Sequence, residues 1–523
     1  MKRIIVSRNR YFDSVFLMQV AQRMSAQPGI RDASALLATQ ANKKVLTELG
    51  YGDAGRDAQF AAAGSNDLVI ALDGEEAAIG AIAVDPDSWL LHSGVAQSEQ
   101  AHEPRSIREA VAARPDASIA LISVPGQHAA REARSAVEQG LNVFLFSSNV
   151  ALADELSLKN MARDKGLIVM GPDCGTAYIA GAGLGFANAV RRGPIGIVGS
   201  SGTGMQEFSS LVHRAGSGIS HGIGVGSRDL SDDIGGISTF TALDALEADA
   251  QTRVIAVIAK PPGKDTQAKL VERCARSGKA VVLCLLGADS PQARQESLRA
   301  ATLIDDAVDL ALEAAGLPAV ANRDGAEVLR HKAAVAVAGM RPEQRHVRGL
   351  FAGGSLCYQT QAIFRDAGLT INSNAPIAGM KMLADPRKSV ATTFVDMGAE
   401  IFVMGRPHPM IDATLRSRRL RDEAADPTVA LVILDFVLGA NASRDPVGDM
   451  LPAIRDAMQA AQHRGHRLDF VASVCGTDGD GQGLAAEMRA LTDAGVRVFA
   501  SNAQAAAFAR EVALLLAARN AER

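Results

Sequence analysis

Two turns rich in glycine and serine carry residues that could hold an anion. They are Gly199-Ser-Ser-Gly-Thr-Gly204 and Gly353-Gly-Ser355, and each stands between an apolar run and a segment of helical period. The start of a helix leaves several backbone N–H groups without partners and carries about half a positive charge. Small residues let an anion approach those donors. Two such turns predict a phosphate site; the alternative is that the glycines only permit tight turns.

The residues that we predict to bind phosphate are Ser200, Ser201, Gly202, Thr203, Gly204, Gly353, Gly354 and Ser355. No Gly-Lys-Ser/Thr follows the glycines in either turn, so neither is a nucleotide-binding P-loop. The glycine spacing also differs from the dinucleotide fingerprint, which needs an acidic residue at the end of a second strand. A nicotinamide-dependent oxidoreductase is therefore disfavoured.

Three further side chains are predicted to be catalytic. His408 lies between two prolines in Gly405-Arg-Pro-His-Pro-Met-Ile-Asp412, directly after an expected strand at 401–404. Pro-His-Pro cannot be helical, so the imidazole is expected at the C-terminal end of a strand, where α/β proteins bind ligands. Arg406 could fork onto a carboxylate or phosphate, and Lys260 stands at another strand end. The alternatives are a rigid surface turn and a solvated lysine.

Other chemically suggestive residues point to turns and packing. In Gly171-Pro-Asp-Cys-Gly175, Asp173 could face a ligand, although a plain turn is the favoured interpretation. The five cysteines lie far apart without CxxC spacing, which indicates neither a disulfide framework nor a zinc site, and Cys174 is expected to be a small buried residue. Thr477-Asp-Gly-Asp480 lacks the glutamate of a calcium loop. We therefore predict no metal.

Composition limits the class of protein. The chain has 523 residues, of which 47% are apolar and 21% charged, and its net charge is −4. This balance argues against nucleic-acid or membrane-surface partners. No apolar run approaches the roughly 18 residues of a membrane span, and the N-terminus lacks the apolar stretch of a signal peptide. A cytoplasmic, multidomain protein is expected.

The elements that must position these residues follow an α/β pattern. Short runs rich in Val and Ile alternate with helical segments such as 129–138, 266–277 and 484–494. Runs that are apolar throughout are typical of parallel sheets covered on both faces, so we predict several doubly wound domains. The predicted strands are 118–124, 142–146, 167–170, 195–198, 254–259, 280–286, 350–352, 401–404, 429–434 and 470–474.

An internal repeat organises the second half of the chain. Besides the two glycine-rich turns, 254–263 is echoed by 429–439, and 279–287 by 468–476, in the same order. This predicts two copies of one flavodoxin-like unit. The predicted division is an N-terminal region at 1–100, a Rossmann-like domain at 101–190, the two copies at 191–316 and 346–523, and a linker at 317–345.

These motifs resemble a known family. Ser106-Ile-Arg-Glu-Ala-Val111, Ile122-Ser-Val-Pro125 and Gly171-Pro-Asp-Cys174 are similar to the CoA-binding portion of the succinyl-CoA synthetase α subunit. Residues 194–315 and 348–515 resemble the ligase domains of its α and β subunits. Both ligase domains on one chain, together with the segment from Gly405 to Asp412, resemble the FdrA family of acyl-CoA-synthetase-like proteins. Residues 1–100 match no family feature.

Two departures qualify what the resemblance implies. Succinyl-CoA synthetases relay phosphate through a histidine, but the corresponding stretch Gly287–Ser297 contains none. In succinyl-CoA synthetases an acidic residue is the partner of that phosphohistidine, and Lys260 occupies the corresponding position in this sequence. A cation at this position suits the binding of a free phosphate or carboxylate. No ATP-grasp domain is apparent. For FdrA-like proteins the resemblance implies a subunit of an oxamate carbamoyltransferase of allantoin breakdown, which converts oxalurate and phosphate to oxamate and carbamoyl phosphate.

Within that hypothesis the two turns bind phosphate, Lys260 and Arg406 stabilise charge, and His408 transfers a proton. The alternatives are an acyl-CoA ligase subunit without its own phosphohistidine and a non-catalytic scaffold. Phosphate or carbamoyl phosphate would be a substrate, no cofactor is assigned, and CoA binding stays open. Companion subunits and a small anionic substrate are the expected partners, and self-association stays open.

Overall fold

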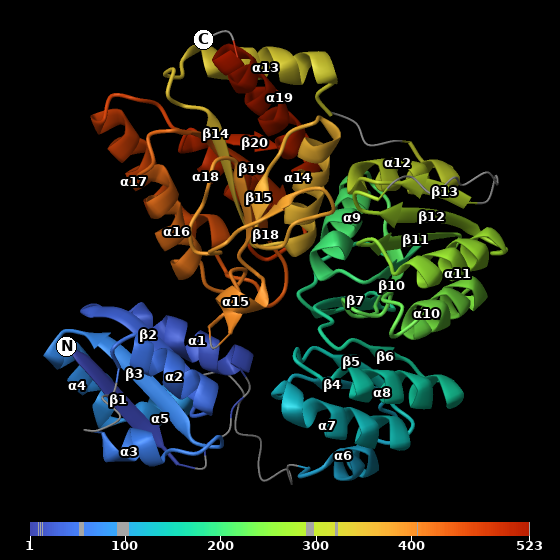
Figure 1. Ribbon diagram of the computed structural model, residues 1–523. Coiled ribbons are helices and arrows are strands. Elements are labelled where there is room, and N and C mark those ends of the chain that lie inside the picture. Colours follow the sequence, from blue (N-terminus) through green and yellow to red (C-terminus); the bar gives the residue numbers. More distant parts are fainter. Residues whose placement is uncertain are drawn as a thin grey trace. The chain divides into compact units, whose positions relative to one another are not determined.

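The computed structural model describes residues 1–523 except 9, 11, 13, 52–56, 92–103, 289–297, 319–322, 405 and 522–523. The chain forms two compact units (Figure 1). The first comprises Met1–Ala113 and Glu400–Pro407, and the second Arg114–Ala399 and His408–Arg523. No helix in the described parts is long and apolar enough to cross a membrane.

The first unit is built on a small antiparallel sheet. Its strands are β1 (Lys2–Ser7), β2 (Ile30–Leu37) and β3 (Leu68–Gly74), in the order β1-β3-β2. Alternate residues of β3 enter two different core clusters, because successive side chains of a strand point to opposite faces. The helices are α1 (Ser14–Ser25), α2 (Gln40–Glu48), α3 (Ala58–Ala62), α4 (Glu76–Val84), α5 (Pro86–Leu91) and α6 (Ile107–Ala113).

The second unit begins with a short parallel sheet. Strands β4 (Ile119–Ile122), β5 (Asn142–Leu145) and β6 (Val169–Met170) pair in sequence order. Helices α7 (Gly126–Glu138) and α8 (Leu152–Asp164) connect them. The predicted parallel α/β class is confirmed here, although this described sheet has only three strands.

The two larger sheets have seven strands each, and their orders reflect the predicted repeat. The orders are β13-β12-β11-β9-β10-β7-β8 and β16-β15-β17-β14-β18-β19-β20. In each, the strand before a glycine-rich turn lies at the centre, and the strands of the other repeated segments (β11 and β12, β18 and β19) follow on one side.

The first of these sheets contains β7 (Thr176–Ile179), β8 (Ala182–Gly185), β9 (Ile195–Gly199), β10 (Ile219–Gly224), β11 (Val254–Ala259), β12 (Ala280–Leu285) and β13 (Leu298–Ala301), with helices α9 (Gly202–Arg214), α10 (Ile237–Ala248), α11 (Lys264–Ala275) and α12 (Ile304–Ala314). The second contains β14 (His346–Phe351), β15 (Asn372–Ser373), β16 (Lys381–Met382), β17 (Thr393–Asp396), β18 (Val429–Val437), β19 (Asp469–Cys475) and β20 (Arg497–Phe499). Its helices are α13 (Ala326–Ala338), α14 (Gly354–Asp366), α16 (Thr414–Ala424), α17 (Pro446–His463), α18 (Leu484–Asp493) and α19 (Asn502–Ala521), while α15 (Glu400–Val403) belongs to the first unit.

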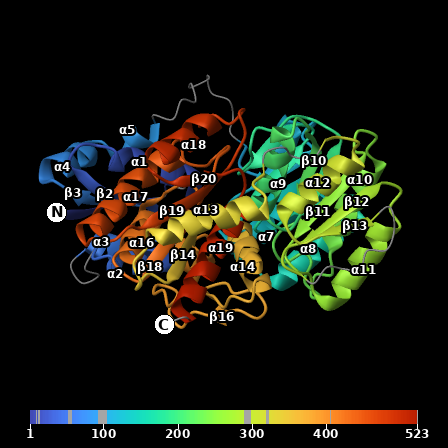
Figure 2. The same ribbon diagram turned by 90° about the horizontal axis from the view of Figure 1, so that it is seen from above.

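Two segments differ from the sequence-based expectation. The predicted strand at 401–404 is wrong, because Glu400–Val403 forms the short helix α15 and the preceding strand is β17. An apolar run of four residues fits either element, and only Phe402 of this helix is buried. The stretch at 317–345, expected as a linker, holds helix α13, which packs against α19 (Figures 1 and 2).

A buried carboxyl group forms a hydrogen bond between the two domains that contain the larger sheets. Glu207 on α9 accepts the backbone N–H of Asn502, the first residue of α19, at 2.9 Å. Only 2% of Glu207 is exposed, and this burial raises its pKa to about 7. The group therefore caps a helix of the following domain and stays protonated up to about neutral pH.

Replacing Glu207 with glutamine is expected to stabilise the protein at alkaline pH. Because the folded-state pKa is raised, Glu207 contributes full stability below about pH 4 and loses it as pH rises through about 7. Glutamine keeps the acceptor without the charge, so the gain should reach about 3 kcal/mol at pH 8 and vanish at pH 4. Denaturation midpoints at both pH values, with exposed Glu138→Gln as control, measure it. A gain that does not depend on pH would contradict this account.

Candidate functional site

The two glycine-rich turns lie against each other. Ser201 is the N-cap of α9, and its hydroxyl forms a hydrogen bond with the hydroxyl of Ser355 in the first turn of α14. The backbone N–H of Ser355 also donates to Thr203 Oγ1 at 3.4 Å. The N-termini of α9 and α14, which come from different domains of the second unit, therefore meet.

Some N–H groups of these turns already have partners. Gly353 donates to Asp435 Oδ2 at 2.7 Å, Gly204 donates to Ser201 Oγ at 3.3 Å, and Ser200 donates to the carbonyl of Ile258. Within the described residues, no hydrogen bond occupies the N–H groups of Ser201, Gly202, Thr203 and Gly354. These donors, together with the hydroxyls, are the ones that an anion could reach.

A buried ion pair shapes the second turn. Asp435 in β18 also accepts the N–H of Ala352 at 2.7 Å and pairs with Arg416 of α16 at 2.7 Å. Arg416 donates to the carbonyl of Leu350 as well. Burial raises the pKa of Asp435 and lowers that of Arg416, while each charge opposes the other's shift. The pair fixes the backbone from which α14 starts.

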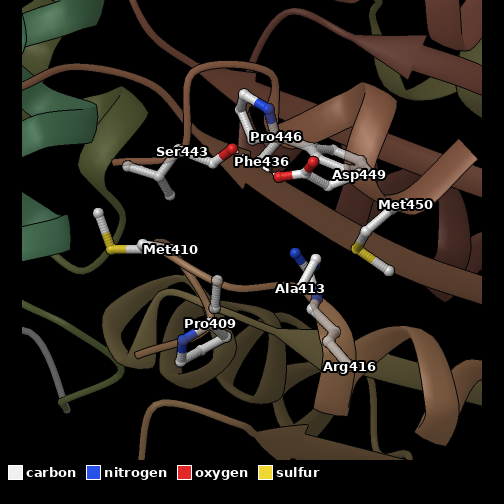
Figure 3. Close-up of a pocket in the computed structure, with 11 residues that line it drawn as sticks. Pro409, Met410, Ala413, Arg416, Phe436, Ser443, Pro446, Asp449 and Met450 are labelled. Atoms are coloured by element: carbon white, nitrogen blue, oxygen red, sulfur yellow. Dashed lines mark hydrogen bonds between the residues drawn. The ribbon is translucent and has the colours of Figure 1, made fainter. Parts of the chain in front are cut away.

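Arg416 also lines a small cavity that Ala352, just before this turn, borders. Figure 3 shows its guanidinium on one side of the cavity and the side chains of Asp449 and Ser443 on the other. The Ser443 hydroxyl donates to Asp449 at 2.5 Å. The cavity measures about 10 Å³, which suits about one water molecule and no substrate.

Lys260 and Asp396 bring opposite charges toward the start of α14. Lys260 follows β11 and is exposed, and its Nζ lies 5.6 Å from the centre of the Tyr358 ring on α14. Asp396 ends β17, and a Cβ on Gly354 would lie 2.8 Å from its Oδ2. Burial raises the pKa of Asp396, and the positive charge of Lys260 opposes that rise. A cation from one domain thus acts on a carboxyl of the other.

His408 lies beside Asp396. A Cβ on Gly398 would be 2.6 Å from His408 Nε2 and 3.3 Å from Asp396 Oδ1, so both groups border the same glycine. The Nδ1 atom accepts the N–H of Met410 at 3.2 Å, which places the proton of the neutral ring on Nε2. Burial lowers the pKa of His408 to about 4, so the ring is neutral at physiological pH.

The folding stability is expected to reflect this neutral histidine. Because its pKa is lowered on folding, the unfolded chain takes up the proton first, and stability falls as pH drops from about 6.5 to about 4. His408→Gln keeps an N–H donor but cannot titrate, so its denaturation midpoint should fall less between pH 7 and pH 5 than the wild-type midpoint. Equal falls in the two proteins would show that His408 titrates normally.

Two predicted site residues stand apart from this group. Arg406 belongs to Glu400–Pro407, which is part of the first unit, so the structure does not place it against the two turns. Asp173 is exposed, has a positive φ of 59°, and accepts the hydroxyls of Ser148 and Ser227. Both hydroxyls belong to other segments of the chain, and a role of Asp173 toward a ligand stays a prediction. Cys174 is buried. Gly405 and most of the stretch Gly287–Ser297 (residues 289–297) lie outside the described residues.

Sequence reasoning missed three residues of the site, namely Asp396, Asp435 and Arg416. A signal was present for the two carboxyls. Asp435 interrupts the apolar strand Val429–Val437, and Asp396 ends the buried strand Thr393–Asp396. A charged residue inside such a strand needs a partner, and in α/β proteins the C-terminal strand ends border the ligand site.

Family models match three parts of the chain. A model described as CoA-ligase matches residues 350–512, and the CoA-binding domain matches residues 190–286. The latter segment lies largely in the region that we assigned to the first ligase-like domain, so the CoA-binding assignment of 101–190 stays a prediction. The "AllF, heavy metal-associated domain" matches residues 1–106, for which the sequence had indicated no family.

The residues of this N-terminal segment do not fit a soft-metal site. Residues 1–106 contain no cysteine, and thiolates are the ligands that such sites use. No group of three or more His, Cys, Asp or Glu side chains that could hold a metal ion occurs in the described part of the chain. The match to the family model therefore gives no ground for a metal-dependent step.

One of the similar proteins covers nearly the whole chain. The uncharacterised protein YahF of Escherichia coli K12 is 41% identical over 97% of this chain and 98% of its own length. A mitochondrial succinate–CoA ligase α subunit of Trichomonas vaginalis is 28% identical over 35% of this chain and 61% of its own. The ATP citrate lyase of Methanothrix soehngenii with citrate and coenzyme A covers 80% of this chain and 85% of its own, with 13% identity and a TM-score of 0.34. The full-length likeness to YahF and the matching domains show that this chain belongs to the FdrA family of acyl-CoA-synthetase-like proteins.

Proposed function

We propose that this protein is a subunit of an oxamate carbamoyltransferase, which converts oxalurate and phosphate to oxamate and carbamoyl phosphate. The observation that carries the proposal is the meeting of two helix N-termini, those of α9 and α14, beside the cation of Lys260. Phosphate would replace the hydrogen bond between Ser201 and Ser355, because each hydroxyl can rotate toward a phosphate oxygen. The N–H groups of Gly202, Thr203 and Gly354 would complete the site.

The reaction needs little beyond an anion site and charge stabilisation. A phosphate oxygen attacks the terminal carbamoyl carbon of oxalurate, and the bond from that carbon to the inner nitrogen breaks. Negative charge develops on the carbamoyl oxygen and on the leaving group. The helix N-termini and Lys260 favour that charge, and the Nε2–H of neutral His408 can donate to a carbonyl oxygen. Arg406 is proposed as a further cationic group.

Family membership and the N-terminal match support this choice over a ligase. The N-terminal model carries the name AllF, which links the chain to allantoin breakdown. A CoA ligase of the succinyl-CoA synthetase type would need a phosphohistidine, and Gly287–Ser297 has no histidine.

The test is a phosphorolysis assay with the chain and its genomic companion proteins. We expect oxalurate and inorganic phosphate to give carbamoyl phosphate, detected by coupling to ornithine carbamoylation. We also expect labelled ATP to leave no acid-labile phosphate on this chain. Acid-labile label together with acyl-CoA formation would establish the ligase instead. Phosphorolysis by the companion proteins without this chain would show that its residues do not carry out the chemistry, which is the scaffold alternative.

A further inference from the structure

The group that moves the proton in this reaction is a separate question, and it rests on the proposed function. Phosphate enters as hydrogen phosphate, and oxamate leaves with one more hydrogen on its nitrogen than that nitrogen had in oxalurate. One proton must therefore pass from the attacking oxygen to the departing nitrogen. His408 was the predicted carrier, but its Nδ1 is occupied by the Met410 N–H and its Nε2 already holds a proton. It can donate a hydrogen bond but has no free lone pair facing the two turns.

We propose that Asp396 is the catalytic acid–base residue, which takes the proton from hydrogen phosphate and returns it to the leaving nitrogen of oxamate. Its Oδ2 borders Gly354, whose N–H group has no hydrogen-bond partner among the described residues. Its Oδ1 accepts the N–H of Gly398 at 2.9 Å, which fixes the carboxyl plane. The residue is 8% exposed, so the carboxyl is held almost entirely within protein.

The positions of the neighbouring groups fit such a shuttle. Asp396 faces the first turn of α14 through Gly354, and His408 lies on its other side across Gly398. A substrate seated on the Gly354 N–H would thus meet a carboxylate and a neutral N–H donor together. A side chain at position 354 or 398 would meet Asp396 or His408 at under 3 Å, so one of these two groups would have to move.

The proton balance closes without another reactant. In the first step the Asp396 carboxylate takes the phosphate proton while the new C–O bond forms, giving a tetrahedral intermediate. In the second step the C–N bond breaks and the protonated Asp396 gives its proton to the nitrogen. The products are oxamate and carbamoyl phosphate, and Asp396 is again ionised. No oxidant, metal or nucleotide takes part.

The charges around Asp396 set the pH at which it works. Burial raises the pKa of Asp396, and so does the negative charge of Asp435 in β18, whereas the positive charge of Lys260 after β11 lowers it; the net direction is upward. His408 is neutral and adds no charge. The first step needs the carboxylate, so kcat/KM should fall on the acid side as Asp396 becomes protonated.

The experiment compares Asp396→Asn and Asp396→Glu with wild type in the reconstituted complex. Asparagine should lower kcat for oxalurate phosphorolysis by at least about 100-fold, and the remaining activity should lose the acidic limb of the pH profile. Glutamate should recover part of the rate. Binding of inorganic phosphate, measured calorimetrically, should be as tight as in wild type or tighter, because a negative charge is removed. Asp366→Asn, at the exposed far end of α14, is the matched control and should behave as wild type.

The outcomes separate the two proposals. If wild type forms carbamoyl phosphate and Asp396→Asn keeps its rate and its acidic limb, Asp396 is not the proton carrier and the proposed function stands. Loss of phosphate binding along with activity in the asparagine variant would assign Asp396 to the architecture of the site and would also overturn the inference. No phosphorolysis by the wild-type complex would remove the proposed function, and the role of Asp396 with it.

Discussion

Replacing Lys260 with glutamate is expected to lower kcat/KM for oxalurate phosphorolysis by at least about 1,000-fold. Removing one group that stabilises developing charge typically costs about 100- to 1,000-fold, and a negative charge adds repulsion of phosphate to that loss. Lys260 is exposed, and its recorded contact is with the Tyr358 ring, so folding should be unaffected. The loss should therefore appear in activity and phosphate affinity and not in the denaturation midpoint.

Two further variants test whether the effect comes from the charge at position 260. Lys260→Arg keeps the charge and should retain part of the activity, whereas Lys264→Glu changes an exposed lysine at the start of α11 and should be nearly silent. Steady-state kinetics with varied phosphate, together with thermal denaturation, provide the measurements. Activity of Lys260→Glu within about threefold of wild type would remove Lys260 from the mechanism.

Replacing Asp435 with alanine is expected to cost about 3–5 kcal/mol of folding free energy. The change leaves the buried Arg416 without its counter-charge, and breaking a buried pair on one side has effects of this size. It also removes the acceptor of the Ala352 and Gly353 N–H groups, so the start of α14 should loosen and activity should fall with stability. The midpoint of urea denaturation, followed by circular dichroism, measures the loss.

A double variant separates the charge effect from packing. Asp435→Leu combined with Arg416→Met removes both charges and should restore most of the lost stability but not the activity, because the turn stays without its acceptor. Asp366→Ala disrupts an exposed ion pair with Arg365 and should cost under about 0.5 kcal/mol. If Asp435→Ala lost as little folding free energy as Asp366→Ala, the ion pair would not be what stabilises the turn.

The sequence predicted the framework of the site well. Runs such as Val254–Ala259 and Val429–Leu434 are apolar throughout, which is typical of covered parallel strands, and both are strands in the structure. The repeated strand–turn–helix segments predicted that Ser201 and Ser355 would occupy equivalent positions. Their contact depends on how two domains pack together, which no local pattern specifies, yet the duplication was enough to suggest it.

The chemistry around those turns was harder to predict. Glycine-rich turns suggested open N–H groups, but one of them, at Gly353, donates to Asp435, which is 82 residues away in sequence. The role expected of His408 changed because its Nδ1 accepts a backbone N–H, a contact that depends on the local fold after Pro407. The 401–404 segment was too short for its period to distinguish a helix from a strand. The sequence did contain one signal that was not used, namely the aspartates within or at the end of apolar strands, Asp435 and Asp396.

The position of phosphate in the complete complex tests the central claim most directly. Crystals grown without phosphate or sulfate would be compared with crystals soaked in inorganic phosphate and oxamate. We expect new tetrahedral density bonded to the Gly202, Thr203 and Gly354 N–H groups, with the Ser201 and Ser355 hydroxyls turned toward it. Phosphate bound elsewhere, with these two hydroxyls still bonded to each other, would contradict the account.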